Sequence, residues 1–139
     1  MSRYFLFCVL LIFQGSGQAA CTVNAPSLSF GFYDPLSGAP ATTSGVAVVT
    51  CNEAPPPTVT LQIGPSAVSG GFLPRRMRQE GGSDLLDYNF YADAGGASVF
   101  GDGTSGTVTQ SAKVTKNKAW SVTIYGRIPP GQDVGVGSY

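Results

Sequence analysis

Residue types that carry out catalysis are few in this chain, and one of them is missing altogether. Histidine is absent from all 139 residues. A Ser-His-Asp triad is therefore impossible, and a zinc site of the usual Cys/His kind is close to impossible. The groups that remain to be weighed are a glycine-rich stretch, a set of aspartates, a cluster of arginines and a pair of cysteines.

The glycine-rich stretch 101–106 (GDGTSG) matches the letters of a dinucleotide-binding fingerprint. That fingerprint needs a strand before it and a helix that opens after it. Here the β-type residues Thr107-Val108-Thr109 follow instead. Asp-Gly also forms hairpin turns, because both residues tolerate a positive φ. We interpret the stretch as a turn and expect no cofactor.

Paired carboxylates are the other arrangement that could do chemistry, in this case glycoside hydrolysis. The candidates are Asp84, Asp87, Asp93 and Asp102. Acidic residues at strand ends and turns more commonly make local hydrogen bonds. We therefore predict no catalytic residue, no metal ligand and no enzymatic activity.

Three arginines, Arg75, Arg76 and Arg78, form a small basic cluster within residues 64–82, a segment that reads as a long loop. Our preferred interpretation is a solvated loop in which one arginine pairs with an acid. The alternative is that the three arginines contact a surface outside the protein. Lys and Arg together number 8 and so do Asp and Glu. This balance gives no reason to expect nucleic acid or anionic lipid as a partner.

The N-terminus predicts export. Arg3 precedes the ten-residue apolar run 4–13 (YFLFCVLLIF), which is too short to span a bilayer and fits a secretory signal peptide. Small residues place cleavage after Ala19, with cleavage after Ala20 as an alternative. Residues 1–19 are thus the expected signal peptide, and no membrane span is expected after its removal.

Cys21 and Cys51 are the only cysteines outside the first twenty residues. Because export leads to an oxidising compartment, we predict that they form a disulfide. Two buried free thiols are the alternative, and lipidation of Cys21 is another. The disulfide is expected to tie the first strand to the second and to remove roughly 3–4 kcal/mol of unfolded-chain entropy.

Residues 20–139 are long enough for one domain. Gly 19 and Pro 10 interrupt many short apolar runs, which predicts an all-β sandwich or barrel. No helix of useful length and no internal repeat is apparent. We expect strands at 27–33, 45–52, 58–63, 85–92, 98–100, 107–115 and 119–127. The core and strand-groove candidates are Phe30, Val48, Leu61, Phe90, Trp120 and Val122.

Several short motifs follow one another in a specific order. The first half of the chain contains CTV at 21–23, SFGxYDPLS at 29–37 and VxTC at 48–51. The second half contains RM at 76–77, LxYNxYxD at 86–93, FGDG at 100–103 and YGRIPxGQ at 125–132. This order resembles the spore coat protein U domain family, the subunits of archaic chaperone–usher pili, and the resemblance covers residues 21–139.

The resemblance implies an incomplete immunoglobulin-like β-sandwich that lacks a strand. It also implies three partners: a periplasmic chaperone, an outer-membrane usher and neighbouring pilus subunits, which supply the strand by donor-strand complementation. The backbone of the incoming strand gives affinity and its alternate side chains fill an apolar groove. The implied location is the periplasm in transit and then a surface pilus that serves adhesion and biofilm formation.

Two departures from the family pattern carry further expectations. Cleavage leaves at most Ala20 before Cys21, so no donor segment is expected, which suits a tip or tip-proximal subunit. The chain also stops where the family's last strand begins, so the final strand or strands are expected to be missing and the chain alone is not expected to be a stable monomer. The alternatives are a free-standing spore-coat or extracellular-layer protein, and a secreted module that binds a carbohydrate or a surface.

Overall fold

A computed structural model describes residues 21–139. The expected signal peptide at 1–19 lies outside the described residues. Within 21–139 the chain forms seven strands and no helix. Nothing helical in this part of the chain is therefore long and apolar enough to cross a membrane.

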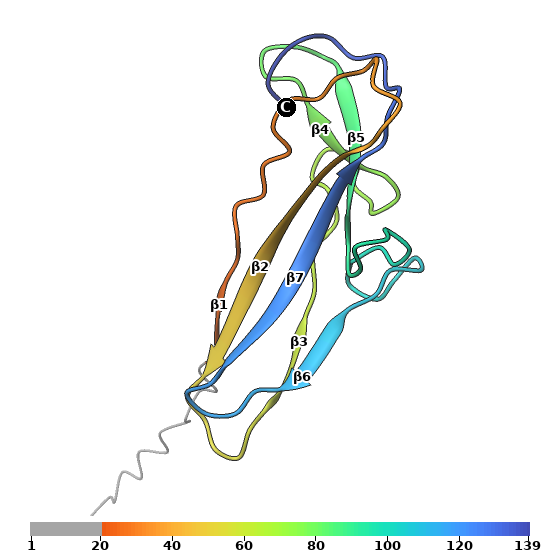
Figure 1. The fold of residues 1–139 in the computed structure, drawn as a ribbon. Helices are drawn as coiled ribbons and strands as arrows, with labels where there is room; N and C mark the ends of the chain where they lie inside the picture. The colour runs from red at the N-terminus through yellow and green to blue at the C-terminus, as the bar shows by residue number, and fades with distance from the viewer. Residues whose placement is uncertain (1–20) are drawn as a thin grey trace, which may run out of the picture.

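Five strands form one antiparallel sheet in the order β1-β2-β7-β5-β4, and β3 pairs with β6 in a separate two-stranded sheet. Figure 1 shows β2 and β7 as two long central strands, with β3 and β6 beside one end of them and β4 and β5 at the other. The strand bounds are β1 Cys21–Asn24, β2 Ala41–Cys51, β3 Thr58–Leu61, β4 Arg75–Arg78, β5 Leu85–Tyr91, β6 Gln110–Lys113 and β7 Ala119–Ile128.

The pairing of β2 with β7 builds the centre of the core. Ala47 lies opposite Val122 and Val49 opposite Trp120, and because side chains alternate along a strand, all of these point to one face. Ala47, Val49, Val122 and Ile124 are buried there, together with Phe100. We call this the inner face of the sheet.

The β3–β6 pair covers only the half of the inner face that lies near the disulfide. Val59 and Leu61 of β3 pack against a buried cluster of Val49, Cys51 and Val114. The other half of the inner face, near β4 and β5, receives no strand from residues 21–139.

The expected fold class is confirmed: the described chain is all-β, with a curled sheet, an incomplete sandwich and one disulfide. Strands were correctly expected near β2, β3, β5, β6 and β7. Two expected strands are wrong. Residues 27–33 form no strand, and 98–100 make only isolated bridges to Tyr91 and Val108.

The first strand is Cys21–Asn24, and residues 27–33 cross the inner face instead of joining the sheet. Glycines permit this crossing, because a Cβ at Gly45 would lie 2.7 Å from Leu28 Cδ2 and a Cβ at Gly126 would lie 2.8 Å from Phe30 Cζ. Leu28 and Phe30 therefore pack inward. Phe32, which would share their side in a strand over 27–33, is fully exposed.

Val48 is a second correction. It was expected in the core, but β2 turns Ala47, Val49 and Cys51 inward and leaves Val48 half-buried on the opposite, outer face. Because β2 carries apolar residues on both faces, its alternation alone does not say which set faces the core.

The stretch GDGTSG is a turn, as expected. Gly103 and Gly106 both have positive φ, at 88° and 77°. Asp102 Oδ1 accepts a hydrogen bond of 2.9 Å from the Thr104 N–H, and a β-bridge between Phe100 and Val108 follows instead of a helix.

The disulfide between Cys21 and Cys51 is confirmed, and it joins two residues that lie directly opposite each other in β1 and β2. All four residues of β1 are exposed, so little apolar burial holds this strand to the sheet. The covalent bond thus adds to the backbone pairing with β2 and to the Thr22–Thr50 hydrogen bond of 2.9 Å that hold this strand.

We predict that replacing Cys21 and Cys51 with alanine lowers the free energy of unfolding by about 3–4 kcal/mol, because the unfolded chain regains the freedom that the crosslink removes. Urea unfolding of the oxidised protein, the reduced protein and the double variant measures this, with each protein carrying an alternating Val/Thr strand fused after Tyr139 to keep it soluble. The reduced protein should match the double variant, and equal midpoints for all three would contradict the prediction.

Candidate functional site

The uncovered half of the inner face forms an open groove with a volume of about 620 Å³. Strands β4 and β5 and the end of β7 form its floor, and residues 28–35 and 134–139 form its sides. The larger apolar and aromatic side chains that line it are Leu28, Phe30, Phe32, Met77, Leu86, Tyr88, Phe90, Ile128, Val134, Val136 and Tyr139.

Aromatic side chains dominate the centre of the groove. The rings of Phe30 and Tyr88 meet edge to face at 6.1 Å between centroids, and those of Tyr88 and Phe90 at 5.3 Å. At the rim, Phe32 and Val136 are each fully exposed, with relative exposures of 103%. A fully exposed Phe forfeits the roughly 1.5–3 kcal/mol that burial of a large apolar side chain provides.

The six core and groove candidates are distributed between three places. Phe30 and Phe90 line the groove. Leu61, Trp120 and Val122 lie in the covered part of the core, and Val48 lies on the outer face. Sequence reasoning missed Met77, which faces the groove from β4, because residues 64–82 were taken for a loop without a strand.

Arg75 is the main correction to the expected basic cluster. It lies in β4, not in a solvated loop, and its residue exposure is only 1%. It therefore cannot contact an outside surface. Arg76 is partly exposed and Arg78 is exposed on the same strand.

The Arg75 guanidinium connects three separate parts of the chain. Nη1 donates to Asn89 Oδ1 at 2.7 Å, and Nη2 donates to the carbonyls of Gly64 at 2.8 Å and Phe100 at 3.2 Å. The rings of Phe72 and Phe90 lie 5.1 and 5.4 Å from its central carbon. Burial lowers the pKa of the guanidinium below its ordinary value. These hydrogen bonds and aromatic rings stabilise the buried positive charge, as water would do at the surface.

Arg76 forms the one expected ion pair. Its Nε lies 2.8 Å from Asp87 Oδ1, and this is the only ion pair among residues 21–139. Both side chains are more than a third exposed. Solvent therefore screens the attraction, and the pair is worth at most about 1 kcal/mol.

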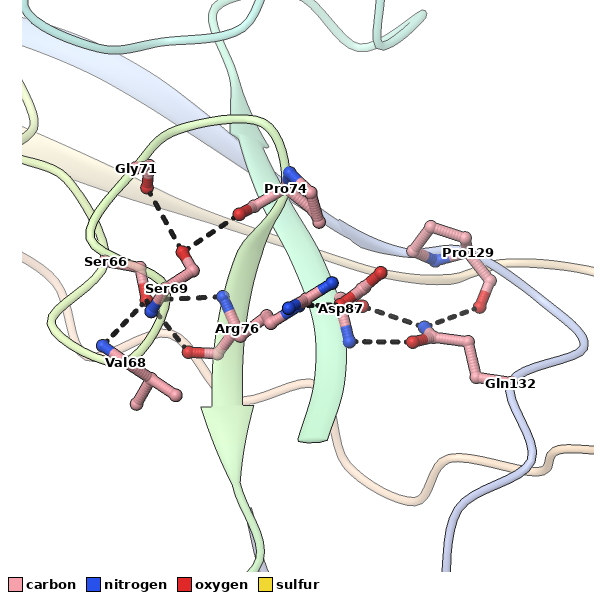
Figure 2. Close-up of polar contacts among 9 residues, drawn as sticks. All are labelled: Ser66, Val68, Ser69, Gly71, Pro74, Arg76, Asp87, Pro129 and Gln132. Carbon is pink, nitrogen blue, oxygen red and sulfur yellow. Dashed lines mark hydrogen bonds and ion pairs between the residues drawn. The ribbon is translucent and has the colours of Figure 1, made fainter. Parts of the chain in front are cut away.

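Two polar side chains close the outer edges of the β4–β5 pair (Figure 2). On the β4 side, Ser66 Oγ donates to the Arg76 carbonyl and accepts from the Arg76 N–H. On the β5 side, the Gln132 amide accepts from the Asp87 N–H at 2.7 Å and donates to the Asp87 carbonyl at 2.8 Å. Each side chain satisfies backbone groups that a neighbouring strand would otherwise pair, which protects the edge from unwanted pairing.

The four aspartates make local contacts, each in a different place. Asp87 pairs with Arg76, and Asp84 accepts from the Gly135 N–H. The pKa of Asp93 is lowered by hydrogen bonds from the backbone of Ala97 and Ser98, and that of Asp102 by the side chain and backbone of Thr104. Among residues 21–139 no three His, Cys, Asp or Glu side chains gather as metal ligands.

Comparison with known families gives one match. The family model described as the Spore Coat Protein U domain matches residues 9–139, which is nearly the whole chain. No curated protein matches the sequence.

We predict that Arg75→Lys lowers the free energy of unfolding by about 2–4 kcal/mol, because a lysine cannot reach Asn89 and two carbonyls at once and leaves buried acceptors unpaired. Arg76→Lys is the matched control, and it should change stability by less than about 1 kcal/mol. Chemical denaturation measures both in the form that carries an alternating Val/Thr strand fused after Tyr139. A loss for Arg75→Lys no larger than that for Arg76→Lys would contradict the role assigned to Arg75.

Proposed function

Because the chain belongs to the Spore Coat Protein U domain family, a family of surface structural proteins, we propose that it is a subunit of a chaperone–usher pilus whose groove receives a strand from another protein. The open groove is the observation that carries this proposal. Its partners would be a periplasmic chaperone during export, the usher at the outer membrane and a neighbouring subunit in the finished pilus.

The shape and lining of the groove suit an extended apolar strand. A strand places alternate side chains on one face, so its apolar side chains can enter a groove while its polar ones face water. The rim residues Phe32 and Val136 would become buried by such a strand. An uncovered groove of this kind invites aggregation, which is the physical reason for a chaperone.

The backbone that would pair with the incoming strand belongs to the β3–β6 sheet. Ser66 and Gln132 already close the edges of β4 and β5, whereas β3 and β6 pair only with each other within residues 21–139. A two-stranded sheet is marginal alone. Leu61 of β3 packs against the same cluster as Leu28 and Phe90, which also line the groove. A strand added to β3 would therefore extend this sheet across the groove.

The proposed role is structural and serves adhesion and biofilm formation, with a place at or near the pilus tip. Labelling of fibre ends, as opposed to the fibre length, would support the tip position. The second candidate is a free-standing coat or extracellular-layer protein. It predicts a monomer that is stable and soluble without any partner.

We expect the exported chain to aggregate or be degraded when produced alone, because its groove remains open. It should become soluble with a matching chaperone, or with an alternating Val/Thr strand fused after Tyr139. Solubility and size-exclusion elution measure the difference. A dilute monomer that unfolds cooperatively without any added strand would contradict the proposal and favour the free-standing protein.

We also expect Phe32→Ser to weaken capture of an alternating Val/Thr peptide by about ten- to a hundredfold, because burial of this exposed ring contributes roughly 1.5–3 kcal/mol on strand binding. Leu36→Ser is the matched control: Leu36 is equally exposed at 94% but does not line the groove. Fluorescence anisotropy with a labelled peptide measures capture. Equal losses for the two variants would mean that the peptide does not enter the groove.

A further inference from the structure

A second cavity lies on the outer face of the five-stranded sheet, on the side away from the groove. It has a volume of about 360 Å³. Its floor is made by outward side chains of the three central strands: Thr42 and Ser44 of β2, Tyr125 and Arg127 of β7, and Tyr91 of β5. Residues 93–96, in the turn that follows β5, contribute to its wall.

The strand register brings these side chains into two rows. Thr42 lies opposite Arg127, and Tyr125 lies between Ser44 on one side and Tyr91 on the other. The Arg127 guanidinium carbon is 5.8 Å from the centre of the Tyr91 ring. A cation, two aromatic rings and two small hydroxyl side chains thus share one cavity.

Among residues 21–139, the cavity is lined by one cationic side chain, Arg127, and one carboxylate, Asp93. The only ion pair within these residues joins Arg76 and Asp87, so Arg127 has no acidic partner. The Asp93 carboxylate accepts from the N–H groups of Ala97 and Ser98 in its own turn.

The turn is fitted closely against Arg127. Gly96 has a φ of 72°, and a Cβ at this position would lie 2.8 Å from Arg127 Nη1. Only a glycine allows the backbone to come this near the guanidinium without displacing it. The backbone of this turn thus lies against one edge of the guanidinium, and the Tyr91 ring lies near it.

We propose that this cavity binds an acidic saccharide through the carboxylate of one sugar. A guanidinium forms paired, charge-assisted hydrogen bonds with a carboxylate, and it can do so while its flat face stacks on a ring. The tyrosines offer an apolar face for the sugar ring and a hydroxyl at the tip. Thr42 and Ser44 supply further partners for sugar hydroxyls. The volume suits one or two sugar rings.

Other anionic ligands fit less well. A phosphate group carries more negative charge than a carboxylate, and it would meet the Asp93 carboxylate as well as the single cation Arg127 in this cavity. An acidic peptide would gain most from an open strand edge, but β2 and β7 are already paired on both sides. A compact ligand with one carboxylate and several hydroxyl groups matches the cavity better than either.

The saccharide site does not depend on the proposed pilus role, since the groove lies on the opposite face of the sheet. The test uses the full chain in the soluble form that the experiment above yields, whether free or strand-complemented. It is titrated with D-glucuronate, with D-glucose as the matched neutral sugar and with acetate as the matched carboxylate. Isotope-edited NMR follows the signals of Tyr91, Tyr125 and Arg127.

We expect saturable binding of D-glucuronate, with glucose and acetate each at least about tenfold weaker. Arg127→Gln should weaken glucuronate binding at least about tenfold, because it removes a charge-assisted pair. Arg78→Gln, an equal change at an exposed arginine outside the cavity, should leave binding unaltered. If Arg127→Gln does not fold, Thr42→Val combined with Ser44→Ala should still weaken binding several-fold.

Three results would overturn the proposal. The first is the absence of saturable glucuronate binding. The second is acetate, or an end-blocked Gly-Glu-Gly peptide, binding as tightly as glucuronate, which would mark a plain anion or peptide site. The third is an equal loss of binding in Arg78→Gln and Arg127→Gln.

Discussion

A second sheet covers only one half of the inner face of the five-stranded sheet, and the other features of the structure follow from this imbalance. The two-stranded β3–β6 sheet covers one half of the inner face, near the disulfide. Over the other half, residues 28–35 and 134–139 lie along the sides of the groove and leave it open. The hydrophobic effect is roughly proportional to area removed from water. The groove is therefore the place where added apolar surface would stabilise the protein most.

The open half is nevertheless well ordered by polar contacts. Arg75 reaches from β4 to Asn89 and to the carbonyls of Gly64 and Phe100, so it joins loops that no second sheet holds together. Ser66 and Gln132 satisfy the edges of β4 and β5 (Figure 2). The proposed incoming strand would therefore find backbone groups to pair with in the β3–β6 sheet and not beside Arg76 or Asp87. Polar side chains thus protect edges of the β4–β5 pair from strand pairing, whereas β3 and β6 pair only with each other within residues 21–139.

The two faces of the sheet carry different kinds of side chain. The inner face offers apolar surface and suits a strand, while the outer face gathers Arg127 and two tyrosines over strands whose backbones are fully paired. The alternation of side chains along β7 makes both possible, since Ile124, Gly126 and Ile128 face inward and Tyr125 and Arg127 face outward. If the inner face receives a strand, as proposed, the proposed ligand site on the outer face stays accessible.

The sequence alone predicted the all-β class, the family, the disulfide and the approximate position of five strands. These depend on local composition, on alternation and on the count of cysteines in an exported chain. It also predicted an ion pair within the arginine cluster, and it identified Phe30 and Phe90 as candidates for the core or the groove. A turn at GDGTSG was predictable because the stretch is rich in glycine and because the β-type residues that follow it exclude a helix.

Only the tertiary structure decided which face of β2 is inside, that residues 27–33 cross the sheet without joining it, and that Arg75 is buried while its neighbours are exposed. Each of these depends on partners distant in sequence: Val122 and Trp120 opposite β2, Gly126 beneath Phe30, and Asn89 and Phe100 around Arg75. A local pattern states which residues share a face. Which face is buried depends on the area and hydrogen-bond partners that the rest of the folded chain brings to it.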